Sequence, residues 1–196
     1  MSKKLLIISY HFPPDSAIGA VRPEKFAKYL PNFGWQAEIL TTLQKNYTHI
    51  DSSFNENNKN YKTHRTRMLP TVRDIYFSFK GLIKRFKPIK NHDWNPPWTP
   101  PSQTSSREKL ISKLKRYFQS CLIWLPDDKN GLILPGIIRG LYIIKKNRID
   151  AIYTTSPPNS DHLIGLFLKK ITGKPWIADF RDPWDWSTKP FFVRSK

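Results

Sequence analysis

The sequence predicts an α/β domain built on a doubly wound, mainly parallel sheet. Strand-like and helix-like segments alternate at both ends of the chain, and the apolar runs stop abruptly at turn residues. Residues 3–10 form a continuous apolar run typical of a buried parallel strand, residues 22–32 have helical spacing, and residues 36–42 form the next strand. A basic segment at about residues 69–122 interrupts the alternation, and we interpret it as a helical insert.

Two residues mark the ends of the first helix. Pro23 suits the first turn of a helix, because backbone N–H groups there have no partner within the helix and proline has no N–H. Gly34 suits the left-handed conformation that often follows the end of a helix. The expected apolar face consists of Phe26, Ala27, Tyr29 and Leu30. The residues expected to point mostly outward are Arg22, Glu24, Lys25 and Lys28. The helix is therefore predicted to be amphipathic.

A second strand-and-helix alternation follows in the carboxyl-terminal third. Residues 61–68 suggest a short strand after a polar loop, and residues 132–147 predict a helix despite an internal Pro-Gly pair. Asp127 and Asp128 precede this helix, and acidic residues there favour a helix N-terminus. A structural role is therefore the default interpretation of both carboxylates.

The last predicted unit is strand, helix, strand. Residues 150–156 form a strand, residues 159–172 a helix that the next glycine stops, and residues 174–180 another buried strand. Either Asn159 or Ser160 is expected to cap the helix.

The predicted insert contains two basic amphipathic helices, within residues 74–90 and 107–118, around a proline- and tryptophan-rich loop at 91–106. Their apolar faces either pack onto the sheet or lie in an anionic lipid headgroup layer. The sequence leaves both alternatives open.

Composition limits the classes of protein. The chain has 196 residues, enough for one domain with a full core, and its net charge of +18 attracts polyanions such as nucleic acid, anionic lipid or phosphorylated substrates. Its single cysteine, Cys121, excludes an internal disulfide and fits a reducing compartment. No run reaches the roughly 20 apolar residues of a membrane span. We expect a cytoplasmic protein, soluble or peripheral on the inner face of the cell membrane.

Three segments are expected at the carboxyl ends of strands, where open parallel sheets bind ligands. These are residues 11–22, 154–159 and 180–186, and they should face a common cleft. In the first, Gly19 allows close approach to a helix N-terminus and Arg22 adds a bidentate donor, a combination that favours a phosphate. The alternative is a rigid turn that binds nothing, since neither a P-loop nor a dinucleotide fingerprint is present.

The other two segments offer polar groups for an acceptor. Ser156 and Asn159 are candidate binding residues, with simple helix capping as the alternative. Arg181 and Asp182 lie among tryptophans, a combination that suits a sugar or phosphate, with a surface ion pair as the alternative. The five histidines have no metal-ligand spacing, and we expect neither a metal nor another cofactor.

Together these segments resemble one enzyme family. HFPPDSAIGAVRPEKFAKYLPNFGWQAEILTT resembles the opening of family 4 glycosyltransferases, where a strand leads into a PP-x(n)-G-x-x-R loop, a helix and a GW/GH-x-x-x-V-L-T strand. DAIYTTSPPNSDHLIGLFLKKITGKPWIADFRDPW looks like a later part of the same amino-terminal domain. The resemblance covers residues 3–42 and about 123–186. Gly19-Ala20 departs from the Gly-Gly pair that is frequent in the family.

The resemblance implies the GT-B architecture, in which two Rossmann-like domains face each other across a cleft. Residues 1–186 would be the acceptor-side domain, and 187–196 a tail or the start of a linker to a donor-binding domain. Gly19 and Arg22 would face the donor phosphates, while Ser156, Asn159, Arg181 and Asp182 would contact the acceptor.

The implied activity is transfer of a sugar from a nucleotide sugar to a cell-surface glycan or polyprenyl-linked acceptor, without a metal. Most donor contacts come from the second domain in this family, so we expect this chain alone to be incomplete for catalysis. Two other classes stay open: a non-catalytic basic module that binds nucleic acid or anionic membrane, and a scaffold that pairs with a separate donor domain. Nucleic acid is the less favoured partner, because no recognised nucleic-acid-binding motif is present.

Overall fold

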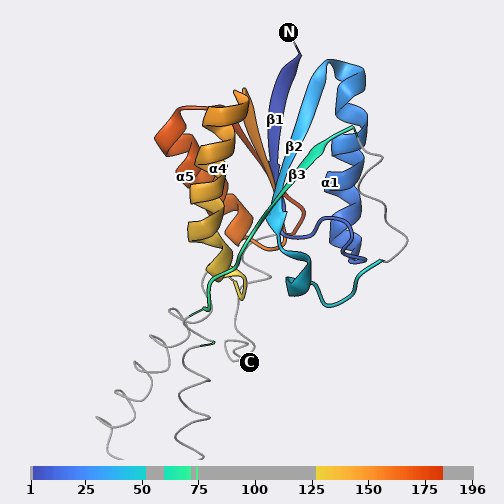
Figure 1. Cartoon of the computed structure of the whole chain (residues 1–196), viewed down its shortest axis with the longest axis vertical. Coiled ribbons are helices and arrows are strands. Elements are labelled where there is room, and N and C mark those ends of the chain that lie inside the picture. Colours follow the sequence, from blue (N-terminus) through green and yellow to red (C-terminus); the bar gives the residue numbers. More distant parts are fainter. Residues whose placement is uncertain (1, 52–59, 72–73, 75–126, 183–196) are drawn as a thin grey trace, which may run out of the picture.

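The computed structural model describes residues 2–51, 60–71, 74 and 127–182. The predicted insert helices and the loop between them lie outside these residues. Five parallel strands form one sheet in the order β3-β2-β1-β4-β5 (Figure 1). The strands are β1 Lys3–Ile8, β2 Trp35–Thr42, β3 Lys62–Thr66, β4 Ala151–Ser156 and β5 Trp176–Phe180. The predicted α/β class with a parallel sheet is confirmed.

Helices cover both faces of the sheet. Helix α1 (Ile18–Tyr29) lies against one face, and α4 (Ile133–Asn147) and α5 (Ser160–Thr172) lie side by side on the other (Figure 1). Short 3-10 turns complete the described elements: η1 Leu30–Phe33, η2 Gln44–Asn46 and η4 Asn130–Leu132. This arrangement is the doubly wound, Rossmann-like layering.

The alternation of side chains along β1 divides the core into two layers. Leu5 and Ile7 pack in the cluster under α1, whereas Leu6 and Ile8 pack in the cluster under α4 and α5. Successive side chains of a strand point to opposite faces, so a strand covered on both faces must be apolar throughout. Each fully buried aliphatic side chain contributes about 1.5–3 kcal/mol relative to an exposed one.

Helix α1 begins earlier than the sequence suggests. It starts at Ile18, so Pro23 lies inside the helix and not in its first turn. The proline is tolerated near the start, where the only bond lost is the one its N–H would give to the carbonyl of Gly19. The buried residues of the helix are Ala20, Pro23, Glu24 and Ala27. The expected apolar face is wrong for Tyr29, which is 49% exposed; Phe26 is 42% exposed, although its ring stacks on that of buried Tyr153. Glu24, expected to point outward, is buried.

Two further expectations need correction. Strand β5 is half-exposed and not buried, with Ile177 at 59% exposure, because it is the last strand of the described sheet. Asn159 occupies the predicted N-cap position of α5, but its side chain forms no capping hydrogen bond. The Asp127 carboxylate caps the helix instead, accepting bonds from the N–H and Oγ of Ser160 at 2.7 and 2.6 Å. Asp127 therefore acts on α5, not on the helix that follows it in sequence.

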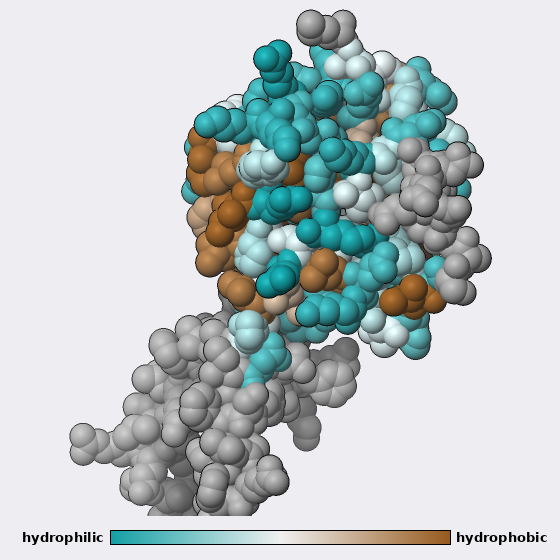
Figure 2. Space-filling view, viewed as in Figure 1, coloured by the Kyte–Doolittle hydropathy of each residue, from teal (hydrophilic) through white to brown (hydrophobic). Residues whose placement is uncertain are grey.

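Apolar side chains gather on the outer surface of α4 and α5 (Figure 2). The exposed residues of this patch, here called the α4–α5 patch, are Leu134, Ile138, Tyr142, Phe167 and Ile171. Among the described residues, no helix is both long and apolar enough to cross a membrane.

Candidate functional site

The carboxyl ends of the strands meet at one edge of the sheet, as expected for parallel strands. β1 pairs with β2 on one side and with β4 on the other, so the direction of winding reverses at β1. In open α/β sheets, this reversal point opens the crevice in which ligands bind. The loop of residues 9–17, here called the first loop, leaves β1 at this point and enters α1.

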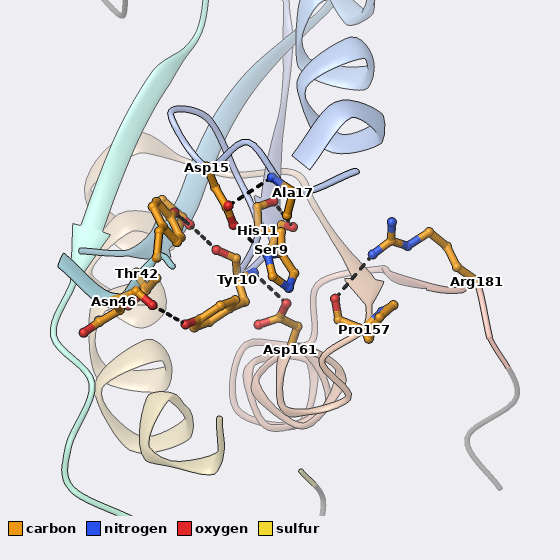
Figure 3. A network of polar contacts seen from close by, with 12 residues as sticks. Ser9, Tyr10, His11, Asp15, Ala17, Thr42, Asn46, Pro157, Asp161 and Arg181 are labelled. Carbon is orange, nitrogen blue, oxygen red and sulfur yellow. Dashed lines mark hydrogen bonds and ion pairs between the residues drawn. The ribbon is translucent and has the colours of Figure 1, made fainter. Parts of the chain in front are cut away.

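Arg181 joins two of the three predicted segments (Figure 3). Its Nε donates to the carbonyl of Ser156 and its Nη2 to the carbonyl of Pro157, the latter at 3.3 Å. The same Nη2 lies 3.3 Å from the position that a Cβ on Gly19 would occupy. The first turn of α1 contains no acidic residue, and its N-cap residue, Ala17, forms no side-chain cap. A helix N-terminus, a glycine and a guanidinium thus meet, which is an arrangement that favours an anion.

Arg22 lies on the same side of the sheet but forms an ion pair. Its Nη2 donates to Asp179 Oδ1 at 2.9 Å, and Oδ2 of the same carboxylate accepts bonds from Tyr153 at 2.6 Å and Thr155 at 3.1 Å. Burial, with the neighbouring Asp179 charge, raises the pKa of the Tyr153 hydroxyl to about 12. The phenol is therefore a hydrogen-bond donor, and Asp179 fixes the side chain expected to approach the phosphate.

A second ionisable pair lies within the first loop. Asp15 Oδ2 is 2.6 Å from His11 Nδ1, and Oδ1 accepts the N–H of Ala17 at 3.1 Å (Figure 3). Asp15 is buried and His11 is about one quarter exposed, at 28% of its side chain. The carboxylate therefore fixes the orientation of an accessible imidazole.

The first loop is attached to α5 through Asp161. This side chain is fully buried, and its Oδ2 accepts the N–H of Tyr10 at 2.7 Å (Figure 3). Burial raises the pKa of this carboxyl well above its usual value, with a smaller opposing effect from Arg181. Its Oδ1 has no hydrogen-bond partner within the described part of the chain. Asp161 thus couples the two walls of the crevice.

The remaining predicted residues differ in accessibility. Ser156 and Asn159 are buried, at 1% and 3% exposure, whereas Asp182 is exposed. The Oγ of Ser156 has no hydrogen-bond partner among the described residues. Gly19, Arg22, Ser156, Asn159, Arg181 and Asp182 all lie at the carboxyl edge, but Ser156 and Asn159 are beneath its surface. The Arg181 guanidinium binds the backbone carbonyls of Ser156 and Pro157. A ligand would therefore contact this guanidinium before it reached the buried side chains of Ser156 and Asn159.

Sequence reasoning missed three carboxylates of this edge: Asp15, Asp161 and Asp179. One signal was available, since Asp179 interrupts the otherwise apolar run KPWIADF. A carboxylate inside an apolar strand needs a polar or charged partner, because burying an unpaired charge is costly. Asp179 lies near the carboxyl end of this strand, so its partner was to be expected there. Nothing in the local pattern distinguishes Asp161 from an ordinary acidic residue in a first helical turn.

Two hollows flank the first loop. One, of about 390 Å³, lies between the loop and α1, with Pro13, Val21 and Lys25 in its wall. The other, of about 410 Å³, lies on the β2 side, with His11, Asn46 and Lys129 in its wall. The second is here called the β2-side pocket. Among the described residues, no group of three or more side chains is placed to hold a metal ion.

The edge can therefore orient a ligand that carries both an anion and hydroxyl groups. Comparison of this chain with protein-family models, with curated proteins and with solved structures gives no match. The geometry at the carboxyl edge and the sequence motifs remain as the grounds for a functional proposal.

Proposed function

We propose that this chain is the acceptor-side domain of a glycosyltransferase with GT-B architecture. The reaction is transfer of a sugar from a nucleotide sugar to a cell-surface glycan or lipid-linked acceptor. A donor-binding domain, on the same or a separate polypeptide, completes the site. The observation that carries this proposal is the meeting of Gly19, Arg181 and the start of α1 at the reversal point of a parallel sheet. This is where a diphosphate is expected in such sheets.

The arrangement explains why each residue type is needed. A phosphate requires backbone N–H groups, and the N-cap residue of α1 is Ala17, whose methyl group cannot cap the helix. Among the described contacts, the only backbone N–H bound by the Asp15 side chain is that of Ala17, which lies before the first turn. A Cβ at Gly19 would be crowded by His11 and Arg181, each with an atom 3.3 Å away, so glycine allows both side chains to lie against the start of the helix. Arg181 supplies charge that is already oriented by two carbonyls. Such preorganised donors stabilise the negative charge that develops on the leaving diphosphate.

The test is transfer by a protein that contains this domain together with a donor-binding domain. Arg181→Ala and Arg22→Ala should each lower kcat/KM by about 10²-fold, since each removes a charge from the phosphate side. Lys28→Ala is the control, because Lys28 is exposed in the last turn of α1, at the opposite end of this helix from the first loop. Full activity in both arginine variants would contradict this assignment.

A second candidate function, attachment to an anionic membrane surface, is favoured by the α4–α5 patch. Its five exposed apolar side chains lie beside the exposed cations Arg139, Lys145, Lys146, Lys169 and Lys170. Helix α4 contains no acidic residue, and the one acid of α5, Asp161, is fully buried. An apolar stripe with only positive charges around it suits an anionic headgroup layer.

Sedimentation with vesicles tests this attachment. The chain should bind phosphatidylcholine vesicles that contain phosphatidylglycerol, and not phosphatidylcholine alone. Ile138→Ser combined with Phe167→Ser should lower vesicle binding by about thirtyfold or more, because each change removes about 1 kcal/mol or more of apolar burial. Undiminished binding by this double variant would contradict the α4–α5 patch as the contact surface.

A further inference from the structure

We propose that the β2-side pocket binds a pyranose ring of the acceptor, with His11 as the contact to its reacting hydroxyl. The inference rests on the proposed function and names a substrate site within it. The pocket has a volume of about 410 Å³ and is formed by the first loop, the loop after β2, and Lys129. Small-molecule sites have volumes of about 300–1,000 Å³, so one sugar ring fits.

The lining has the chemistry that a polyhydroxylated ring requires. A sugar hydroxyl both donates and accepts a hydrogen bond, so its site needs both kinds of partner. Asp15 offers carboxylate oxygens, the Lys129 ammonium donates, and Asn46 offers an amide. Thr48 is exposed at the rim and adds a hydroxyl. The rings of Tyr10 and Tyr47 also line the pocket and offer apolar surface to the C–H groups of a sugar ring.

The groups of the pocket are held in position before any ligand arrives. Asp15 fixes the His11 ring through Nδ1 at 2.6 Å, which leaves Nε2 for a ligand. The Tyr10 hydroxyl donates to the carbonyl of Asn46 at 2.8 Å and so joins the two loops (Figure 3). Lys129 is anchored by Asp128 at 3.1 Å and lies over the Tyr10 ring at 5.2 Å. Fixed polar groups lose little conformational entropy on binding.

His11 is also the link between this pocket and the proposed phosphate position. It lines the pocket, and its Cβ and Cδ2 lie 3.3 Å from the position of a Cβ on Gly19. Arg181 Nη2 lies at the same distance from that position. A hydroxyl bound at His11 would therefore be adjacent to a phosphate bound at Gly19 and Arg181. An acceptor in this pocket would therefore be separated from the donor phosphate by His11 alone.

The experiment is an NMR titration of the ¹⁵N-labelled chain with a panel of methyl pyranosides of gluco, galacto and manno configuration. At least one should bind in the millimolar range and shift the amide signals of Tyr10, His11, Asn46 and Lys129. His11→Gln and Lys129→Gln should each weaken this binding by about fivefold, the effect of losing roughly one hydrogen bond. Lys28→Gln makes the same charge change as Lys129→Gln outside the pocket and should bind as the unmodified chain does.

Three outcomes overturn the inference. One is an absence of glycoside binding, and another is binding that neither pocket variant weakens. The third is a set of shifts confined to residues 156–159 and 181, which would place the sugar on the other side of the first loop. Thermal unfolding of each variant identifies any loss of fold. We expect Lys129→Gln to keep the fold, because the Lys129 side chain is partly exposed.

A parallel titration with UDP-glucose and GDP-mannose separates this inference from the proposed function. Shifts at Gly19 and at the Arg181 side chain without glycoside binding would overturn the pocket assignment and leave the proposed function standing. An absence of both kinds of binding would count against both proposals.

Discussion

At the scale of single residues, His162 shows how burial sets a protonation state in this protein. Its Nδ1 is 2.8 Å from Thr154 Oγ1, and its ring packs against Phe180 with centroids 4.1 Å apart. Its Nε2 has no hydrogen-bond partner in the described part of the chain. Burial lowers the pKa of the imidazole to about 4, with a small opposing effect from Asp179. The ring is therefore neutral near pH 7.

Protonation of His162 should make the fold sensitive to acid. Between pH 4 and the usual histidine pKa of about 6.5, the unfolded chain binds the proton and the folded chain does not. The free energy of unfolding should therefore rise with pH across this window, by about 2–3 kcal/mol from this residue. Urea unfolding at pH 4.5 and 7 measures the change, and His162→Gln should reduce it.

Other groups titrate in the same range, so the comparison is between the variant and the unmodified chain at each pH. An equal pH dependence in both proteins would mean that His162 does not carry this effect.

At the scale of elements, one carboxylate fixes the start of α5. Asp127 accepts bonds from Ser160 and also from the N–H of Lys129 at 2.8 Å, so it ties the segment before α4 to the N-terminus of α5. The charge lies at the positive end of the helix dipole. Helix α5 in turn carries Asp161, whose contact with Tyr10 positions the first loop. The capping contact therefore supports the crevice.

Removing this cap should destabilise the domain. Asp127→Ala should lower the free energy of unfolding by about 1–2 kcal/mol, the usual cost of losing a helix cap. Asp128→Ala is the matched control, since this neighbouring carboxylate is 44% exposed and pairs only with Lys129 among the described contacts. Equal losses in the two variants would contradict the capping role.

The contact between α4 and α5 depends on small residues. A Cβ at Gly140 would lie 2.6 Å from Leu168 Cδ1, and one at Gly136 would lie 2.6 Å from Ile164 Cδ1. Real Cβ atoms do not approach so closely, so the glycines allow the two helices to pack.

Gly140→Ala should therefore lower the free energy of unfolding by about 1–3 kcal/mol, although alanine favours helix elsewhere. Chemical denaturation measures the change. The penalty should shrink in a Leu168→Ala background, because the clashing atoms are then absent. A penalty that stays the same in that background would exclude this contact as its cause.

At the scale of the whole molecule, stability should decrease from the centre of the sheet to its edges. β1 and β4 are each paired on both sides and packed by helices on both faces, whereas β3 and β5 are the outer strands of the described sheet. Local opening is easiest where few apolar contacts are buried.

Amide hydrogen exchange tests this order. The amides of Ile7 and Tyr153 should exchange most slowly, and those of Ile177 and Thr63 faster by at least about tenfold. Both pairs are followed in one native-state experiment, so solvent conditions are the same for each. Equal protection of β5 and β4 would mean that a further element covers this edge.

The fold class was predictable because periodicity and turn residues report local geometry. LLII, AEIL and AIYTT are apolar on both strand faces, which is the pattern of a buried parallel strand. Gly34 and Gly173 were predicted to end their segments, and both have positive φ, at 76° and 70°. The start of α1 was predicted too late because a proline is typical of a first helical turn, whereas Pro23 lies further inside the helix. The exposure of β5 was not predicted because an apolar run does not show whether a further strand or helix covers it.

The sequence by itself determined the order of strands and helices, the two-sided burial of the sheet, and the candidate residues at the carboxyl edge. Only the tertiary structure decided that Arg181 meets Gly19, that Arg22 pairs with Asp179, and that Asp127 caps α5. The physical reason is range. Helical and strand patterns arise from neighbours a few residues apart, whereas these contacts join residues 33 to 162 positions apart along the chain and depend on how the sheet brings its strand ends together.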